Sequence, residues 1–293
     1  MQCARCENRN EGWSVVIDVL LATYRPNAEM LKAQIDSIRT QKGVEVNLIQ
    51  REDETGEGAC ANFSALLMKS RADYVAFSDQ DDVWLSDKLE REMVLMRDLE
   101  QRHGKDEPLL VFTDLKVTDA ELNVLSESHF DWIKVSPRRN LPRQIVFQNT
   151  ASGNTILINA ALRELANPIP AEAFMHDHWL MLVTSAFGHL AYSAKPSVLY
   201  RQHGGNVSGS RKVGFGYFWW RFRQGRCSLR TRLYANVHQA EAFVARFGNR
   251  SPRELAALVG IGGKPWIVRV WILLRHRIFK NGFFRNLGTL LVI

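Results

Sequence analysis

The chain has 293 residues, 46% of them apolar and 10% aromatic, so it can form a sizeable core and global disorder is not expected. Residues 1–200 hold 21 Lys or Arg and 29 Asp or Glu, a net charge of −8. Residues 201–293 hold 17 Lys or Arg and only 2 acidic residues, a net charge of +15. This asymmetry predicts an anionic partner for the basic tail: a membrane surface, a nucleic acid or a phosphorylated substrate.

The N-terminal residues are polar, and we expect residues 1–13 to be disordered. Cys3 and Cys6 form a CxxC pair, but no second pair completes a four-ligand zinc site. The cysteines show no disulfide framework, which favours a reducing cytoplasm. Because the chain lacks an apolar leader and any uninterrupted apolar stretch of about 18 residues, we expect neither a signal peptide nor a membrane-spanning helix.

Strand and helix patterns then alternate along the chain. Short apolar runs rich in β-branched residues predict strands at 15–22, 44–49, 74–78, 109–113, 152–158 and 191–200. Helical spacing predicts helices at 31–38, 63–70 and 177–186, and another after an N-cap at Ser86. This order favours an α/β domain over 14–210, followed by a basic, aromatic-rich helical region over 211–293.

Three aspartates, Asp79, Asp81 and Asp82, directly follow the predicted strand 74–78. Ligands of open α/β sheets bind at the carboxyl ends of strands, and side chains two residues apart on extended backbone share one face. Asp79 and Asp81 therefore form a candidate site for Mg²⁺ or Mn²⁺, with substrate phosphates completing the shell. The alternative is that the aspartates only make turn and cap hydrogen bonds.

Four motifs, in the expected order, resemble large family-2 glycosyltransferases of the GT-A fold, particularly bacterial rhamnosyltransferase-like members. The motifs are Ala22-Thr23-Tyr24-Arg25-Pro26-Asn27, similar to "ATYN"; Phe77-Ser78-Asp79-Gln80-Asp81-Asp82-Val83-Trp84, similar to "DQDDxW"; His176-Asp177-His178-Trp179, similar to "HDxW"; and Tyr200-Arg201-Gln202-His203-Gly204-Gly205-Asn206-Val207, similar to "YRQHxxNV". The resemblance implies a Rossmann-like, mostly parallel central sheet flanked by helices. It also implies metal-dependent transfer of a sugar, rhamnose among the candidates, from a dTDP- or UDP-linked donor.

The resemblance, together with the chemistry of the side chains, gives candidate residues for each part of such a site. The donor-binding candidates are Thr23, Tyr24, Arg25, Glu52, Asp53, Asn62, Asp79 and Arg201. The metal candidates are Asp79, Asp81 and His203, and the acceptor-binding candidates are His176, His178, Trp179 and Gly153. Several have structural alternatives: a surface position for Arg201, a structural role for His203, a core position for Trp179 and a bulge at Gly153.

Asp177 is the candidate general base. At the start of a predicted helix it could equally be an N-cap, and the resemblance is what favours the base. One base attacking opposite the leaving group implies inversion at the anomeric carbon.

The chain departs from the family at two places. Glu52 and Asp53 stand where the family has a "DDGS" element, and the helix expected after it is missing before 58–63. Arg25 replaces the usual Asn of the first motif. Both departures leave the donor nucleotide open.

The basic tail interleaves aromatic residues with Lys and Arg at 217–223 and 265–293, and no acidic residue follows Glu254. This pattern predicts an interfacial segment on an anionic leaflet, at the cytoplasmic face of the inner membrane, where a lipid-linked acceptor would lie. The alternative is a helical subdomain packed on the catalytic core. A homodimer is also compatible with the sequence.

The sequence favours transfer of a sugar to a glycan or lipid-linked acceptor in cell-surface polysaccharide synthesis over other functions. A nucleotidyltransferase predicts a glycine-rich, Lys-containing loop after the first strand, which residues 23–27 lack. A nucleic-acid-binding protein leaves Asp79, Asp81 and Asp177 without a role. A degenerate transferase that only binds a sugar nucleotide remains an alternative because of the shortened 52–58 region.

Overall fold

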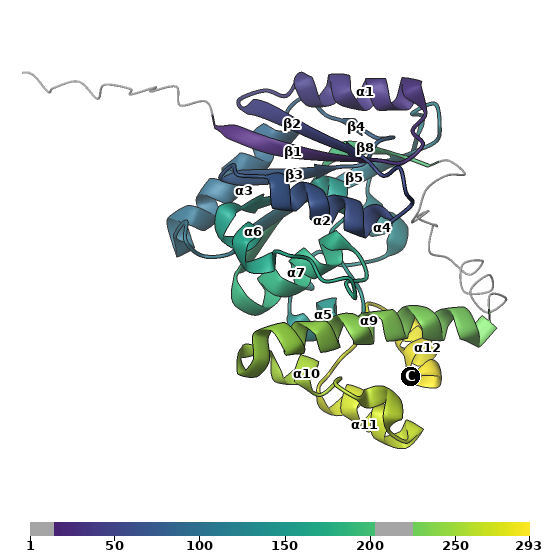
Figure 1. Cartoon of the computed structure of the whole chain (residues 1–293). Helices are drawn as coiled ribbons and strands as arrows, with labels where there is room; N and C mark the ends of the chain where they lie inside the picture. Colours follow the sequence, from purple (N-terminus) through teal and green to yellow (C-terminus); the bar gives the residue numbers. More distant parts are fainter. Residues whose placement is uncertain (1–14, 203–224) are drawn as a thin grey trace, which may run out of the picture.

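The computed structural model describes residues 15–202 and 225–293 (Figure 1). The expected disorder of residues 1–13, the boundary between 210 and 211, and the candidate metal ligand His203 lie outside the described residues.

Eight strands form one mixed sheet in the order β2-β1-β3-β7-β5-β8-β4, with β6 paired to β5. The strands are β1 (Val16–Thr23), β2 (Glu45–Glu52), β3 (Tyr74–Ser78), β4 (Val83–Trp84), β5 (Leu109–Thr118), β6 (Val124–Ser126), β7 (Ile156–Asn159) and β8 (His189–Arg201). β1 pairs in parallel with β2 and β3, and β5 with β8, whereas β4, β6 and β7 run antiparallel to their neighbours. The sheet thus has five strands in one direction, and β7 separates them into two groups.

Helices cover the sheet and extend beyond it (Figure 1). They are α1 (Ala28–Arg39), α2 (Ala59–Lys69), α3 (Lys88–His103), α4 (His129–Ile133), α5 (Pro142–Ile145), α6 (Ala160–Ala166), α7 (His176–Phe187), α9 (Gly225–Phe247), α10 (Arg253–Ala256), α11 (Trp266–Arg275) and α12 (Phe283–Val292), with short 3-10 turns η1 (Gly153–Thr155), η2 (Gly248–Arg250) and η3 (Ile261–Gly263). The predicted α/β fold with a C-terminal helical segment is confirmed. In the part of the chain that the structure describes, no helix is both long and apolar enough to cross a membrane.

Two local predictions were wrong. The strand predicted at 152–158 begins with η1, and its extended part starts only at Ile156. Ser86 does not cap α3, since the residue before that helix is Asp87 and its side chain makes no capping hydrogen bond.

The C-terminal helices share a hydrophobic core with the α/β body. Leu233, Val237 and Phe243 of α9 are buried in the same cluster as Trp179 and Leu180 of α7. Figure 1 shows α9 running along α7 and α5, with α10, α11 and α12 on its far side. The packed-subdomain alternative therefore describes α9 to α12, and it brings their residues next to the α/β body.

A buried ion pair supports the turn that follows the acidic cluster. Lys88 Nζ lies 2.8 Å from both carboxylate oxygens of Glu92, and neither side chain is exposed. The same Nζ lies 4.1 Å from the centre of the Trp84 ring. Burial lowers the pKa of Lys88 and raises the pKa of Glu92 to about 7, so each charge depends on the other.

We predict that Lys88→Met lowers the free energy of unfolding by about 3–5 kcal/mol, because it leaves the Glu92 carboxyl buried without its partner. The double variant Lys88→Met with Glu92→Leu should recover much of this loss, since apolar side chains of similar volume can replace a buried pair. Urea unfolding of wild type, both single variants and the double variant measures the coupling. A double variant less stable than Lys88→Met would contradict it.

Candidate active site

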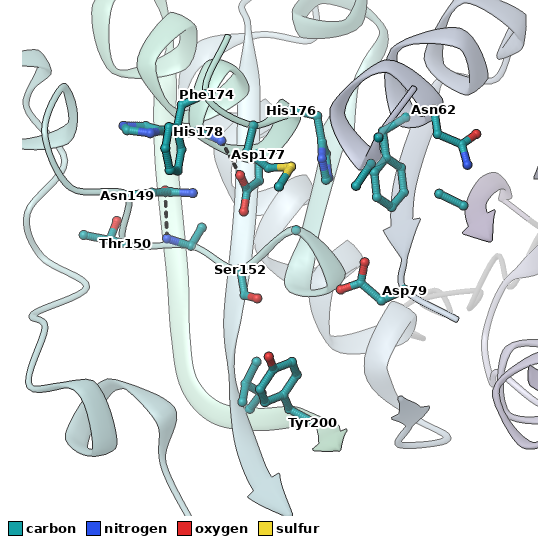
Figure 2. Close-up of a pocket in the computed structure, with 18 of the residues that line it drawn as sticks. Asn62, Asp79, Asn149, Thr150, Ser152, Phe174, His176, Asp177, His178 and Tyr200 are labelled. Atoms are coloured by element: carbon teal, nitrogen blue, oxygen red, sulfur yellow. Dashed lines mark hydrogen bonds between the residues drawn. The ribbon is translucent and has the colours of Figure 1, made fainter. Parts of the chain in front are cut away.

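A cavity of about 700 Å³ opens at the carboxyl ends of β1, β3 and β8. Its walls come from all four sequence motifs and from the C-terminal helices. The lining residues used below are Thr23, Tyr24, Asp53, Asn62, Asp79, Gln80, Asp81, Asn149, Ser152, Gly153, His176, Asp177, His178, Tyr200, Arg232, Asn236 and Lys280. Figure 2 shows Asp79 on one side of this cavity and Asp177 on another, with Ser152 below Asp177 and Tyr200 at the bottom of the view.

Asp79 and Asp81 bring two carboxylates into the cavity at the end of β3. Burial, together with the charges of Asp81 and Asp177, raises the pKa of Asp79 to about 7. The carboxyl groups of Asp79, Asp81 and Asp177 are thus close enough for their charges to interact. Like charges held this close favour a bound cation.

The third aspartate of the cluster faces away from the cavity into the protein. Asp82 is fully buried, and its Oδ1 accepts a 3.0 Å hydrogen bond from the backbone N–H of Arg201. Its Oδ2 accepts a hydrogen bond from the side-chain amide of Asn154. Burial raises the pKa of Asp82 well above its usual range, with further contributions from Asp79 and Asp81. Asp82 therefore joins β3, β8 and η1 and is not exposed to a ligand.

Arg201 is also held within the protein. Its position does not support the direct donor contact predicted from the sequence. Its Nε donates to the backbone carbonyl of Asp81 at 2.9 Å, and its Nη1 donates to that of Ala120 at 2.6 Å. The side chain is 8% exposed and does not line the cavity. It fixes the backbone that presents Asp81.

Asp177 lies in the first turn of α7, with its carboxylate in the cavity (Figure 2). Its Oδ1 accepts a 2.6 Å hydrogen bond from the backbone N–H of His178, and Gly153 and Asn149 lie with it in the cavity wall. Burial nonetheless raises its pKa to about 6. An oriented carboxylate with a raised pKa combines the fixed geometry and the basicity that a general base needs.

The ring of His176 packs within the protein beside Asp177. Its ring centre lies 3.9 Å from that of Phe63 and 5.2 Å from that of Phe77, and both ring nitrogens are buried without a hydrogen-bond partner. Burial lowers its pKa to about 3, so the ring is neutral. A Cβ atom at Gly153 would lie 2.7 Å from His176 Nε2. The histidine ring therefore requires the absence of a side chain at Gly153, and the acceptor-binding role of Gly153 stays a prediction.

His178 is held by α5. Its Nε2 lies 2.7 Å from the backbone carbonyl of Ile145, which requires the proton on Nε2. Burial, with a smaller contribution from the nearby charge of Lys280, lowers the pKa of His178 to about 4. His178 thus contributes a neutral, fixed ring to the cavity wall.

The first motif and the end of β2 meet at the other side of the cavity. Gln80 exchanges two hydrogen bonds with the backbone of Tyr24, at 2.7 and 3.1 Å, and so ties β1 to the acidic cluster. Asn62 Nδ2 donates to the carbonyls of Thr23 and Arg51, both at 3.2 Å.

The Asp53 carboxylate accepts hydrogen bonds from the backbone N–H groups of Gly56, Glu57 and Gly58, which lower its pKa. This network folds the shortened segment after β2 into a tight turn. Asp53 lines the cavity while its two oxygens hold the turn. The turn takes the place of the missing helix.

Three other candidates do not line the cavity. Trp179 is fully buried, its Nε1 donates to the Ala166 carbonyl at 3.1 Å, and it packs against Phe243, so the acceptor-stacking prediction is wrong. Arg25 and Glu52 are exposed and are absent from the cavity wall. Arg25 has a φ of 43°, in the left-handed region that Asn, the usual residue of this motif, tolerates better.

Sequence reasoning missed the contribution of the C-terminal helices to the site. Arg232 and Asn236 of α9, and Lys280 between α11 and α12, line the cavity with the motif residues. The charge reversal along the sequence signalled an anionic ligand, but nothing local marked these positions. Asn149, which lines the cavity near Asp177, also carried no signal, whereas Tyr200 lay within a motif.

The donor set fits a hard divalent cation only in part. Among residues 15–202 and 225–293, no group of three or more His, Cys, Asp or Glu is arranged to hold a metal ion. Mg²⁺ commonly binds through one or two carboxylates and takes its remaining ligands from water and substrate phosphates. Asp79 and Asp81, with the raised pKa of Asp79, fit an ion of that kind.

We predict that Gly153→Ala lowers the free energy of unfolding by about 1–3 kcal/mol, because the new methyl group must displace the His176 ring. It should also disturb Asp177, whose Cβ lies 3.6 Å from the position of the new methyl group. Urea unfolding measures the first effect. Gly263→Ala is the matched control, since a Cβ there meets no atom within 4 Å. Equal stability of the two variants would contradict the packing argument.

A comparison with protein-family models finds no match, and a comparison with curated proteins finds none either. Among solved structures, the chain is similar to TarS from S. aureus, at 14% identity and a TM-score of 0.49, over 94% of this chain and 54% of that one. The chain thus spans about half the length of that TarS chain.

It is also similar to TarS 1-349 in complex with UDP-GlcNAc, at 13% identity and a TM-score of 0.47, over 89% of this chain and 80% of that one. A third similar structure is the mannosyltransferase PcManGT from Pyrobaculum calidifontis in complex with GDP-Man and Mn²⁺, at 15% identity and a TM-score of 0.43, over 91% and 87% of the two chains. At identities and TM-scores this low, the likenesses establish neither a family nor an activity for the chain.

Proposed function

We propose that the chain is an inverting glycosyltransferase that moves a sugar from a nucleotide-diphosphate donor to a hydroxyl of an acceptor. The observation that carries this proposal is the convergence of two carboxylate sites on one cavity. Asp79 and Asp81 lie at a strand end, and Asp177 begins α7. The sequence resemblance gives the same two sites complementary roles.

Asp79 and Asp81 are proposed to bind the donor diphosphate through Mg²⁺ or Mn²⁺. Such an ion supplies Lewis-acid stabilisation of the charge that develops on the leaving phosphate oxygens. Arg201 and Gln80 act indirectly, because they fix the backbone on either side of these carboxylates. The ends of β1 and β2, with Tyr24 and the Asp53 turn, form the adjacent wall for the nucleotide. We infer a UDP or dTDP donor from the motif resemblance.

Asp177 is proposed to take the proton from the acceptor hydroxyl as its oxygen bonds to the anomeric carbon. The backbone N–H of His178 donates to the carboxylate and holds it in place. The acidic cluster and Asp177 come from different elements of the cavity wall, so the nucleophile and leaving group can lie on opposite faces of the sugar. This arrangement supports inversion.

The acceptor is proposed to be a glycan or lipid-linked saccharide used in polysaccharide synthesis at the cytoplasmic face of a membrane. Arg232 and Lys280 supply positive charge to the cavity wall and favour an acceptor or donor group with negative charge.

Asp177→Asn should lower the transfer rate by about 10²- to 10⁴-fold, because the amide cannot accept a proton. It should leave donor binding intact, and Asp98→Asn, at an exposed position on α3, is the control. In the wild type the rate should rise as pH rises through about 6, where the raised pKa of Asp177 places its deprotonation. Transfer at the wild-type rate by Asp177→Asn, or a rate independent of pH in this range, would sink the assignment.

Asp81→Ala should remove metal-dependent donor binding, since it deletes one of two proposed ion ligands. Thermal-shift measurements with UDP- and dTDP-sugars, with and without Mn²⁺, test this, because a ligand that binds only the folded chain raises its melting temperature. In the wild type the shift should need Mn²⁺. A similar, metal-independent shift in wild type and Asp81→Ala would contradict the site.

A further inference from the structure

The two last helices expose large apolar side chains on their outer faces. On α11 these are Trp266, Ile267, Trp271 and Leu274, and on α12 they are Phe283, Phe284, Leu287 and Leu291. Ile267 is 70% exposed, Trp271 59% and Phe283 75%. Within each helix the spacing places these side chains on one side. We call these eight residues the α11–α12 surface.

The opposite faces of the same helices are already packed. Ile272, Leu273 and Thr289 are buried, as are Ile278 and Ile293 beside the helices. The Trp266 Nε1 donates to the Leu290 carbonyl at 3.0 Å, which joins α11 to α12. The helices therefore hold their places through the inner faces, with the hydrogen bond of Trp266 linking the outer residues to that packing.

The charges within the segment that carries the α11–α12 surface all have one sign. Six Lys or Arg and no acidic residue follow Glu254 in the sequence. Lys264, Arg275 and Arg277 are exposed next to or within this pair of helices. Two copies of the chain meeting through this surface would bring like charges together, which disfavours self-association.

We propose that the α11–α12 surface docks on an anionic lipid bilayer. Aromatic and aliphatic side chains that project outward, with Lys and Arg and no acids around them, fit the boundary between headgroups and acyl chains. Each helix has ten residues, about 15 Å long, so both helices would lie along the surface of the bilayer. This docking is independent of the proposed catalytic residues, none of which belongs to the surface.

The test is flotation of the full chain with vesicles of phosphatidylglycerol and phosphatidylcholine, compared with vesicles of phosphatidylcholine alone. Wild type should bind the anionic vesicles more tightly, and added salt should weaken the binding. The triple variant Trp271→Ser, Phe283→Ser, Phe284→Ser should lose binding by at least about tenfold, because each aromatic side chain contributes apolar area. Val94→Ser on α3 is the matched control, since Val94 is an apolar side chain 62% exposed outside this surface.

Two charge-reversal variants test the contribution of the basic residues next to this surface. Lys264→Glu with Arg275→Glu should weaken binding to anionic vesicles by more than about twentyfold. This follows because the loss of each basic residue weakens the binding by about fivefold. Arg39→Glu with Lys69→Glu changes the net charge equally at exposed ends of α1 and α2 and should bind as wild type. Circular dichroism checks that every variant is folded.

The proposal is overturned if folded wild type binds neither kind of vesicle, or if the serine variant binds as tightly as Val94→Ser. It is also overturned if sedimentation shows a dimer in wild type that the serine variant loses, because the surface would then join two copies of the chain. Equal weakening by both charge-reversal pairs would assign the attraction to net charge and not to this surface.

Discussion

The buried carboxylate of Asp82 is the junction on which the rest of the site depends. It accepts hydrogen bonds from the Arg201 backbone and from the Asn154 side chain, so it joins the end of β3 to β8 and to η1. A carboxyl group buried in this position is costly unless its oxygens are satisfied, and here each oxygen accepts a hydrogen bond. The junction sets the position of Asp79 and Asp81 relative to η1, and Gly153 of η1 lies beside Asp177 in the cavity wall. The metal-binding and base candidates are thus coupled through one residue that never meets a ligand.

Neighbouring residues of a motif take different places because the backbone turns them in different directions. In α7, successive side chains lie about 100° apart around the helix axis. Trp179 therefore enters the core while Asp177 reaches the cavity, and the His176 ring packs on Phe63. A motif of adjacent residues combines ligand contacts with the packing that fixes them. The sequence of a motif alone does not distinguish ligand contacts from packing. This is why the acceptor-binding prediction for Trp179 was wrong.

What the sequence predicted well were the elements with a strong local signal. β3 lies where its continuous apolar run predicted it, and α7 begins one residue before the prediction, at His176. The elements α4, α5 and β4 were missed because they have five residues or fewer, too few to show a period. The place of Arg201 was beyond local reasoning, since its partners are backbone carbonyls of distant segments. The cavity-lining position of Lys280 depends on tertiary packing in the same way.

The packing of Trp179 changes the meaning of the charge asymmetry along the chain. Its ring lies 5.8 Å from that of Phe243, and this contact holds α9 against the helix that carries Asp177. α9 in turn brings Arg232 to the cavity wall, and Lys280 reaches the same wall from the segment before α12. The acidic body and the basic tail are therefore two sides of one cavity. A substrate with a phosphate or diphosphate would meet two kinds of wall. At the acidic strand ends a cation is needed between the carboxylates and the ligand, whereas the basic side chains can contact the ligand directly. The acidic and basic parts of the sequence thus line different parts of the same cavity. This arrangement favours a ligand with anionic groups at more than one point.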